Sequence, residues 1–231
     1  MKSRDDWKLI RLLFILLVLA SSVSGCATQY AQVGETLKEA FIGQEDIQLT
    51  QEQAQALPYA SSYVRIDQGQ QVMMVLALVE PNTLTGQPQL KWVSADGAML
   101  VTENGRIVKT INLPTGNLLR RAPVITTANT EALSLWQAGQ QKVYFDWQAY
   151  YGIQAEALLI PQKSQLLSSV LWQASTTHWQ EQITLNEFGL RWTNEYWVDD
   201  EGNVLKTIQY LGPEMSQIEM NIIKPYVHSS F

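Results

Sequence analysis

Residues 90–111 read LKWVSADGAMLVTENGRIVKTI, and this segment indicates the fold class. Three short runs rich in apolar residues, at 90–95, 99–102 and 106–111, are separated by the pairs Asp96-Gly97 and Asn104-Gly105. Asp-Gly and Asn-Gly pairs between such runs are strong signals for tight hairpins. Two hairpins in succession make a meander, so we expect three neighbouring antiparallel strands here.

The flanking sequence extends this pattern in both directions. Residues 72–79, VMMVLALV, are apolar at every position, which predicts a central strand covered on both faces. Apolar and polar residues alternate over 142–149, 188–198 and 218–223, and a further strand is expected over 204–211. Residues 116–123 are predicted to be a loop. We therefore expect an all-β dominated fold, an antiparallel meander that closes into a barrel-like or a sandwich arrangement.

Helical signals are confined to short segments. Val33, Leu37 and Phe41 recur at four-residue spacing, Thr50 to Gln53 form a capping box, and a third helix is predicted over 129–139. The fold class thus includes two or three short helices. We divide the chain into a signal peptide (1–25), a lipidated N-terminus with short helices (26–58) and a single antiparallel β domain (59–231).

Composition excludes several classes of protein. The chain of 231 residues has 16 Lys and Arg against 22 Asp and Glu, a net charge of -6, so it lacks the basic surface that nucleic-acid binding needs. With one cysteine and two histidines it has no material for a disulfide framework or a cysteine-based zinc site. We expect no bound metal, no cofactor and no nucleic-acid partner.

The single cysteine lies in an informative place. Four basic residues precede the apolar run LLFILLVLA at 12–20, which is typical of a signal peptide and too short for an ordinary transmembrane helix. Val23, Ser24 and Gly25 then precede Cys26, and this order matches a bacterial lipoprotein box. We expect cleavage before Cys26 and lipidation of Cys26, including palmitate, which gives a stable anchor.

Ala27 follows the cysteine, where a sorting signal for the inner membrane would place an aspartate. We therefore expect the outer membrane of a Gram-negative bacterium, with the protein facing the periplasm. Cleavage leaves 12 basic against 20 acidic residues and a net charge of -8, so lipid and not charge would hold the mature chain at the membrane.

Three further stretches resemble a known family. They are ALPYAS at 56–61, residues 90–110, and YWVD at 196–199 with IKPY at 223–226. Together with the lipoprotein box they resemble the YjbF/GfcB family, the group 4 capsule polysaccharide lipoproteins. The resemblance implies an outer-membrane lipoprotein encoded with exopolysaccharide or capsule export proteins, an antiparallel β fold and no established catalytic chemistry. Only Cys26 carries a role over from the family.

Residue patterns with catalytic or metal-binding potential are weak. His178 and Glu181 stand three apart, so on a strand they face opposite sides and cannot act as one acid-base pair. Residues 199–203, DDEGN, have oxygen ligands but not the spread of a calcium-binding loop, and they suit a hairpin turn. No pair of acidic residues stands out for glycoside hydrolysis. We therefore predict that the protein is not an enzyme.

Aromatic residues supply the best candidate for a binding surface. Trp197 shares its strand face with Arg191 and Glu195, so a large ring would stand among polar side chains. Arg120 and Arg121 form a small basic pair that could contact an acidic polymer. These five residues are the predicted binding surface.

Two classes of function stay open at this point. The first is a non-enzymatic component of exopolysaccharide or capsule production or export, which would dock export proteins, including an outer-membrane β-barrel, or the polysaccharide itself. The alternative is a periplasmic lipid or lipoprotein carrier, because a curved antiparallel sheet can enclose an apolar cavity.

Overall fold

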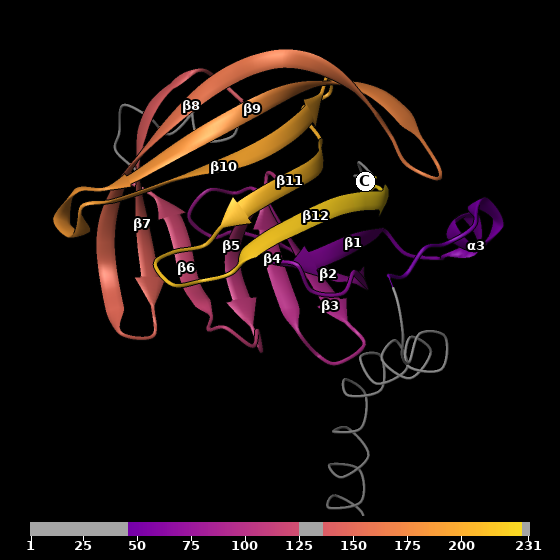
Figure 1. Ribbon diagram of the computed structural model, residues 1–231, viewed down its shortest axis with the longest axis horizontal. Coiled ribbons are helices and arrows are strands. Elements are labelled where there is room, and N and C mark those ends of the chain that lie inside the picture. The colour runs from indigo at the N-terminus through magenta and orange to yellow at the C-terminus, as the bar shows by residue number, and fades with distance from the viewer. Residues whose placement is uncertain (1–45, 125–135, 228–231) are drawn as a thin grey trace, which may run out of the picture.

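Twelve antiparallel strands form one sheet that curls into a nearly closed barrel in the computed structural model, which describes residues 46–124 and 136–227 (Figure 1). The strands are β1 (Ser61–Ile66), β2 (Val72–Pro81), β3 (Pro88–Ser94), β4 (Met99–Glu103), β5 (Arg106–Ile111), β6 (Leu118–Pro123), β7 (Gly139–Trp147), β8 (Tyr150–Ser168), β9 (Gln173–Leu185), β10 (Leu190–Asp199), β11 (Val204–Tyr210) and β12 (Gln217–Lys224). The sheet order is β5-β4-β3-β2-β1-β12-β11-β10-β9-β8-β7-β6. The predicted meander is β3, β4 and β5.

The two ends of the sheet meet without forming a regular ladder. β5 and β6 follow one another in the chain but stand at opposite ends of the strand order. Near their connection, the Leu118 amide donates a hydrogen bond to Thr110 Oγ1 over 2.9 Å. This contact brings the ends together, so the barrel-like alternative is confirmed over the sandwich.

The barrel encloses the main hydrophobic core. Large side chains from both ends of the strand order are fully buried in it, among them Trp92, Leu100, Ile107, Phe145 and Ile183. A second cluster covers the outer face of β1, β2 and β12, where Met73, Val75 and Ile223 pack with Leu49 and Ala54. β2 is therefore buried on both faces over its first half, at Met73, Met74 and Val75, while the rest of its apolar run is half-buried.

A short helix and an arching hairpin complete the described structure. Thr50 caps the N-terminus of helix α3 (Gln51–Ala56), and the predicted capping box with Gln53 is present. The remaining helical element among the described residues is the single 3-10 turn η2 (Asn186–Phe188). Neither is long and apolar enough to cross a membrane. The helix predicted near residues 28–43 lies outside the described residues.

Two expectations need correction or completion. Residues 118–123, predicted as loop, form strand β6, which pairs with β7 at one end of the sheet, where Pro123 can be accommodated. The predicted helix over 129–139 lies mostly outside the described residues, but its expected last residue, Gly139, instead begins β7. Sequence reasoning also assigned no element to the long strands β8 and β9, which arch over the barrel with β10 in Figure 1.

Candidate functional site

Trp197 lies on the outer face of β10, as the alternation predicts, but it is not an open platform. Trp197 is only 8% exposed. The indole stacks on His178, with ring centroids 4.7 Å apart, and its Nε1 donates to Gln165 Oε1. On β11, the other neighbour of β10, the ammonium of Lys206 lies 5.2 Å from the centre of the Trp197 ring. Trp197 is thus held inside an outer-face row of His178, Trp197 and Lys206.

Glu195 and Arg191 share this outer face but are spread along the strand. Glu195 Oε2 lies 3.5 Å from His178 Nε2, so Glu195 borders the row. Arg191 is exposed and pairs in register with Thr184, six residues from Trp197. At about 3.4 Å per residue, this separates Arg191 from Trp197 by roughly 20 Å along the strand. The structure therefore joins Glu195 to the Trp197 row and leaves Arg191 apart.

Arg120 and Arg121 do not form one basic surface. Arg120 is half exposed and pairs with Asp146 over 2.7 Å. Arg121 points into the barrel, where it is buried and pairs with Glu181 over 2.6 Å. Adjacent residues on a strand face opposite sides, so the two guanidinium groups are separated by the sheet. This corrects the prediction that Arg121 contributes to a surface.

Glu181 is the centre of a buried polar cluster inside the barrel. Its carboxylate pairs with Arg106 at 3.0 Å as well as with Arg121, and it accepts hydrogen bonds from the Tyr196 hydroxyl at 2.8 Å and Asn194 Nδ2 at 3.3 Å. These partners come from β5, β6 and β10. The cluster therefore ties both ends of the strand order to the long strands across the barrel interior.

The charges of this cluster fix its protonation states. Burial opposes ionisation of Glu181, but the positive charges of Arg121 and Arg106 outweigh it and lower the pKa of the carboxyl to about 2. Burial and the Glu181 charge raise the pKa of the Tyr196 hydroxyl. Near neutral pH, Glu181 is therefore ionised and Tyr196 is neutral. A carboxyl so far from neutral pH is poorly suited to general acid or base catalysis.

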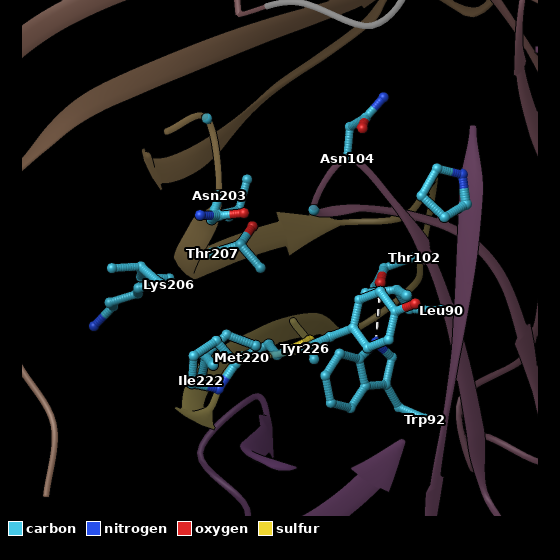
Figure 2. Close-up of a pocket in the computed structure, with 16 residues that line it drawn as sticks. Leu90, Trp92, Thr102, Asn104, Asn203, Lys206, Thr207, Met220, Ile222 and Tyr226 are labelled. Carbon is cyan, nitrogen blue, oxygen red and sulfur yellow. Dashed lines mark hydrogen bonds between the residues drawn. The ribbon is translucent and has the colours of Figure 1, made fainter. Parts of the chain in front are cut away.

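A cavity of about 210 Å³ opens at the mouth of the barrel, between β3, β4 and the ends of β11 and β12 (Figure 2). Trp92, Leu90, Met220 and Ile222 give it apolar walls, and Figure 2 shows Lys206 pointing away from the Trp92 ring. The Trp92 Nε1 already donates to Thr102 Oγ1 at 2.9 Å. We call this cavity the mouth cavity. Its walls favour an apolar group or the face of a ring.

The acidic turn at the rim of the mouth cavity is occupied by its own hydrogen bonds. Asp199 Oδ1 accepts from the amides of Glu201 at 3.0 Å and Asn203 at 2.8 Å, and Asp199 Oδ2 accepts from Asn203 Nδ2. The turn therefore uses its carboxylate as hairpins do. Within residues 46–124 and 136–227, no group of three or more His, Cys, Asp or Glu side chains is placed to hold a metal ion.

None of the mouth-cavity residues was predicted as a site. They come from β3, β4, β11, β12, the turns that precede β5 and β11, and the segment after β12, and only closure of the barrel brings them together. Each has an ordinary role in its own strand pattern, so the sequence has no local signal for the cavity. Cys26, the predicted lipidation site, lies outside the described residues.

Comparison with known proteins finds a matching family and two relatives that are named after it. Residues 34–223 match the family described as group 4 capsule polysaccharide lipoprotein gfcB, YjbF. The uncharacterized lipoprotein GfcB of Escherichia coli strain K12 is 28% identical over 240 residues, which cover 91% of this chain and 97% of GfcB. The uncharacterized lipoprotein YjbF of the same strain is also 28% identical, over 90% of this chain and 96% of YjbF.

A solved structure matches the fold. The crystal structure of the hypothetical lipoprotein YmcC from Escherichia coli K12 superimposes with a TM-score of 0.67 at 26% sequence identity. The match covers 89% of this chain and all of that one. The curled antiparallel sheet is therefore shared with a lipoprotein of known structure.

Proposed function

Because this chain belongs to the YjbF family of group 4 capsule polysaccharide lipoproteins, we propose that it is an outer-membrane lipoprotein that acts as a non-enzymatic component of exopolysaccharide or capsule production or export. The family match over residues 34–223 is the observation on which this proposal depends. The relatives of nearly equal length support a similar role for the whole chain.

The anchor is the first part of the proposal. Lipidation at Cys26 would tether the folded domain through the 19 residues that separate Cys26 from Asp46, the first described residue. An extended chain of that length spans at most about 70 Å, so the domain would stay close to the membrane. Ala27, in place of an aspartate, supports sorting of the lipoprotein to the outer membrane. The domain would then lie in the periplasm beside other export proteins, including an outer-membrane β-barrel.

The non-enzymatic role is supported by the state of the titratable groups. Glu181, the most buried carboxylate, is neutralised by Arg106 and Arg121, and the Asp199 carboxylate is taken up by its hairpin turn. His178 lies on the outer face, stacked against Trp197, while Glu181 lies inside, so these two groups cannot share a substrate. We therefore favour binding or docking over turnover.

Deletion of the gene and complementation test the proposal. We expect deletion to reduce extracellular polysaccharide and the wild-type gene to restore it. A Cys26→Ala variant should lose palmitate labelling, leave the outer-membrane fraction and fail to restore the polymer. Unchanged polymer after deletion would contradict the proposed function. A Cys26→Ala protein that still fractionates with the outer membrane would contradict the proposed anchor.

The apolar mouth cavity favours lipid carriage as a second candidate. Its volume of about 210 Å³ lies below the ~300–1,000 Å³ of typical ligand pockets, so it would hold only part of an acyl chain. Native mass spectrometry of the protein, purified without added lipid, tests this candidate. A stoichiometric co-purified lipid would support carriage, and its absence would leave export as the better account.

A further inference from the structure

A second and larger hollow lies on the outer face of the barrel, beside the tip of the β8–β9 hairpin. Figure 1 shows this tip projecting beyond the sheet. The hollow has a volume of about 440 Å³, within the ~300–1,000 Å³ range of ordinary ligand sites. We call it the outer groove. It is lined by Gln48, Leu49, Tyr63, Gln71, Leu167, Ser168, Ser169, Val170, Trp172, Leu205, Lys206, Asn221 and Ile222.

The walls of the outer groove are fixed by specific contacts. Trp172 Nε1 donates to the Ile223 carbonyl at 3.1 Å, which holds the hairpin tip against β12. Val170 packs onto the outer hydrophobic cluster beside it. On the opposite wall, the Leu49 amide donates to the Tyr63 hydroxyl at 2.7 Å. The groove is therefore a built feature of the fold, with one wall from the hairpin and one from the segment before α3.

The lining of the outer groove is about half polar and half apolar, and it is almost free of charge. Lys206 is the one charged side chain among the described residues that line it, and Lys206 is paired with Glu219 over 2.8 Å. Its other polar side chains are amides and hydroxyls, namely Gln48, Gln71, Asn221, Tyr63, Ser168 and Ser169. Amides and hydroxyls both donate and accept hydrogen bonds, as sugar hydroxyls do. Aromatic rings such as that of Trp172 suit the apolar faces of sugar rings.

The outer groove adjoins the mouth cavity. Leu205, Lys206 and Ile222 line both hollows, so the two meet at the ends of β11 and β12. Two adjoining hollows suit a ligand that extends across both, such as a linear chain, better than a compact one. Lys206 also borders Trp197, so the outer-face row of His178, Trp197 and Lys206 leads to the edge of the groove.

We propose that the outer groove binds a segment of polysaccharide through its uncharged sugar units. This inference rests on the proposed function, since it names the polymer as a direct ligand of the protein. Recognition is by hydrogen bonds to sugar hydroxyls and by ring contacts, with little contribution from ionic attraction. Binding should therefore be insensitive to salt, because screening weakens only charge interactions.

The binding experiment uses the full-length protein in detergent and the extracellular polysaccharide purified from the bacterium that carries the gene. Isothermal titration compares the native polymer with the same polymer after chemical reduction of its carboxylates, at low salt and at 0.5 M NaCl. We expect binding to both preparations, with less than about a threefold change in affinity between the two salt concentrations. No binding, or binding only to the unreduced polymer, would overturn the proposal.

Two variants locate the site. Gln48 is exposed and its side chain has no hydrogen-bond partner among the described residues, so Gln48→Ala should preserve the fold and weaken binding about three- to tenfold. Ser169→Trp should fill the groove and abolish binding. It should leave the hairpin folded, because the bond from the Ser169 amide to the Trp172 carbonyl does not involve the side chain. Gln154 is also exposed and lies on β8 outside both hollows, so Gln154→Ala is the matched control and should bind as the wild type does.

The outcomes separate this inference from the proposed function. If deletion abolishes polymer export while Gln48→Ala and Ser169→Trp bind polymer like the wild type, the groove is not the site and the proposed function stands. If deletion leaves export unchanged, the proposed function fails, and the titration alone decides whether the groove binds polysaccharide. Unchanged thermal unfolding of each variant shows that lost binding reflects the groove and not the fold.

Discussion

Gln209 of β11 and Ile107 of β5 are joined across the barrel by a hydrogen bond of 3.0 Å from the Ile107 amide to Gln209 Oε1. The same side chain donates from Nε2 to the Gly105 carbonyl, also at 3.0 Å. Gln209 therefore occupies an amide and a carbonyl two residues apart where the chain enters β5, as a neighbouring strand would. Since β5 and β6 form no ladder, this side-chain amide replaces part of the pairing that a closed barrel would supply.

Replacing Gln209 with alanine should destabilise the protein markedly. The Ile107 amide and the Gly105 carbonyl would lose their partner in a site where Gln209 is fully buried. A buried polar group without a partner costs about 1–3 kcal/mol, so we expect Gln209→Ala to lower the free energy of unfolding by about 2–4 kcal/mol. Urea denaturation measures this loss. Gln154→Ala, at an exposed position, should change it by less than about 0.5 kcal/mol.

Neutralising Glu181 should be costly for a different reason. Glu181→Gln keeps the shape of the side chain but leaves the guanidinium groups of Arg106 and Arg121 without their counter-charge inside the barrel. Breaking a buried ion pair in this way costs about 3–5 kcal/mol, which urea denaturation at pH 7 would detect. Glu187→Gln, at an exposed position, is the matched control. Equal stability of the two variants would contradict the role assigned to the cluster.

The stability difference between the wild type and Glu181→Gln should also depend on pH. The pKa of Glu181 is lowered in the folded state from 4.5 to about 2, so its stabilisation is present above the unfolded-state pKa and is lost as the pH falls. The free energy of unfolding of the wild type should exceed that of Glu181→Gln most above about pH 5, and the difference should shrink towards pH 2. Denaturation series at several pH values measure it. A difference that stays constant down to pH 2 would show that the Glu181 charge is not its source.

The central part of the fold was predictable because its signals are local. Asn104 and Gly105 both have positive φ values, 50° and 75°, the conformation that an Asn-Gly hairpin turn favours. The continuous apolar run of β2 likewise indicates a strand covered on both faces, and in the structure the core covers one face and α3 covers the other. Each of these features is encoded within about ten consecutive residues.

The long strands and the buried charges were not predictable for physical reasons. The second half of β8 extends beyond the barrel and is exposed at most positions, so it shows no alternation of apolar and polar residues. Arg121 reads as a surface residue because arginine is rarely buried without a partner. Its partner Glu181 is 60 positions away, and only the closure of the barrel brings the two together. The outer groove and the mouth cavity depend on the same closure.

The Asn104-Gly105 turn also packs tightly against β11, and this gives a last prediction. A Cβ atom on Gly105 would lie 2.3 Å from Val204 Cγ2, whereas a Cβ on Gly97, which also has a positive φ, would meet nothing within 4 Å. Both Gly→Ala changes incur backbone strain of about 1–2 kcal/mol. Gly105→Ala adds a steric clash, so it should cost about 1–3 kcal/mol more than Gly97→Ala in urea denaturation.

A double-mutant cycle isolates that clash. Val204→Gly removes the atoms that the new methyl group would strike, so the loss caused by Gly105→Ala should be smaller in the Val204→Gly background than in the wild type. The expected coupling free energy is about 1–3 kcal/mol, while Gly97→Ala combined with Val204→Gly should be additive within about 0.5 kcal/mol. Additive effects for Gly105→Ala and Val204→Gly would mean that the hairpin turn does not rest on β11. Coupling of the expected size would place the turn against the start of β11, at the rim of the mouth cavity.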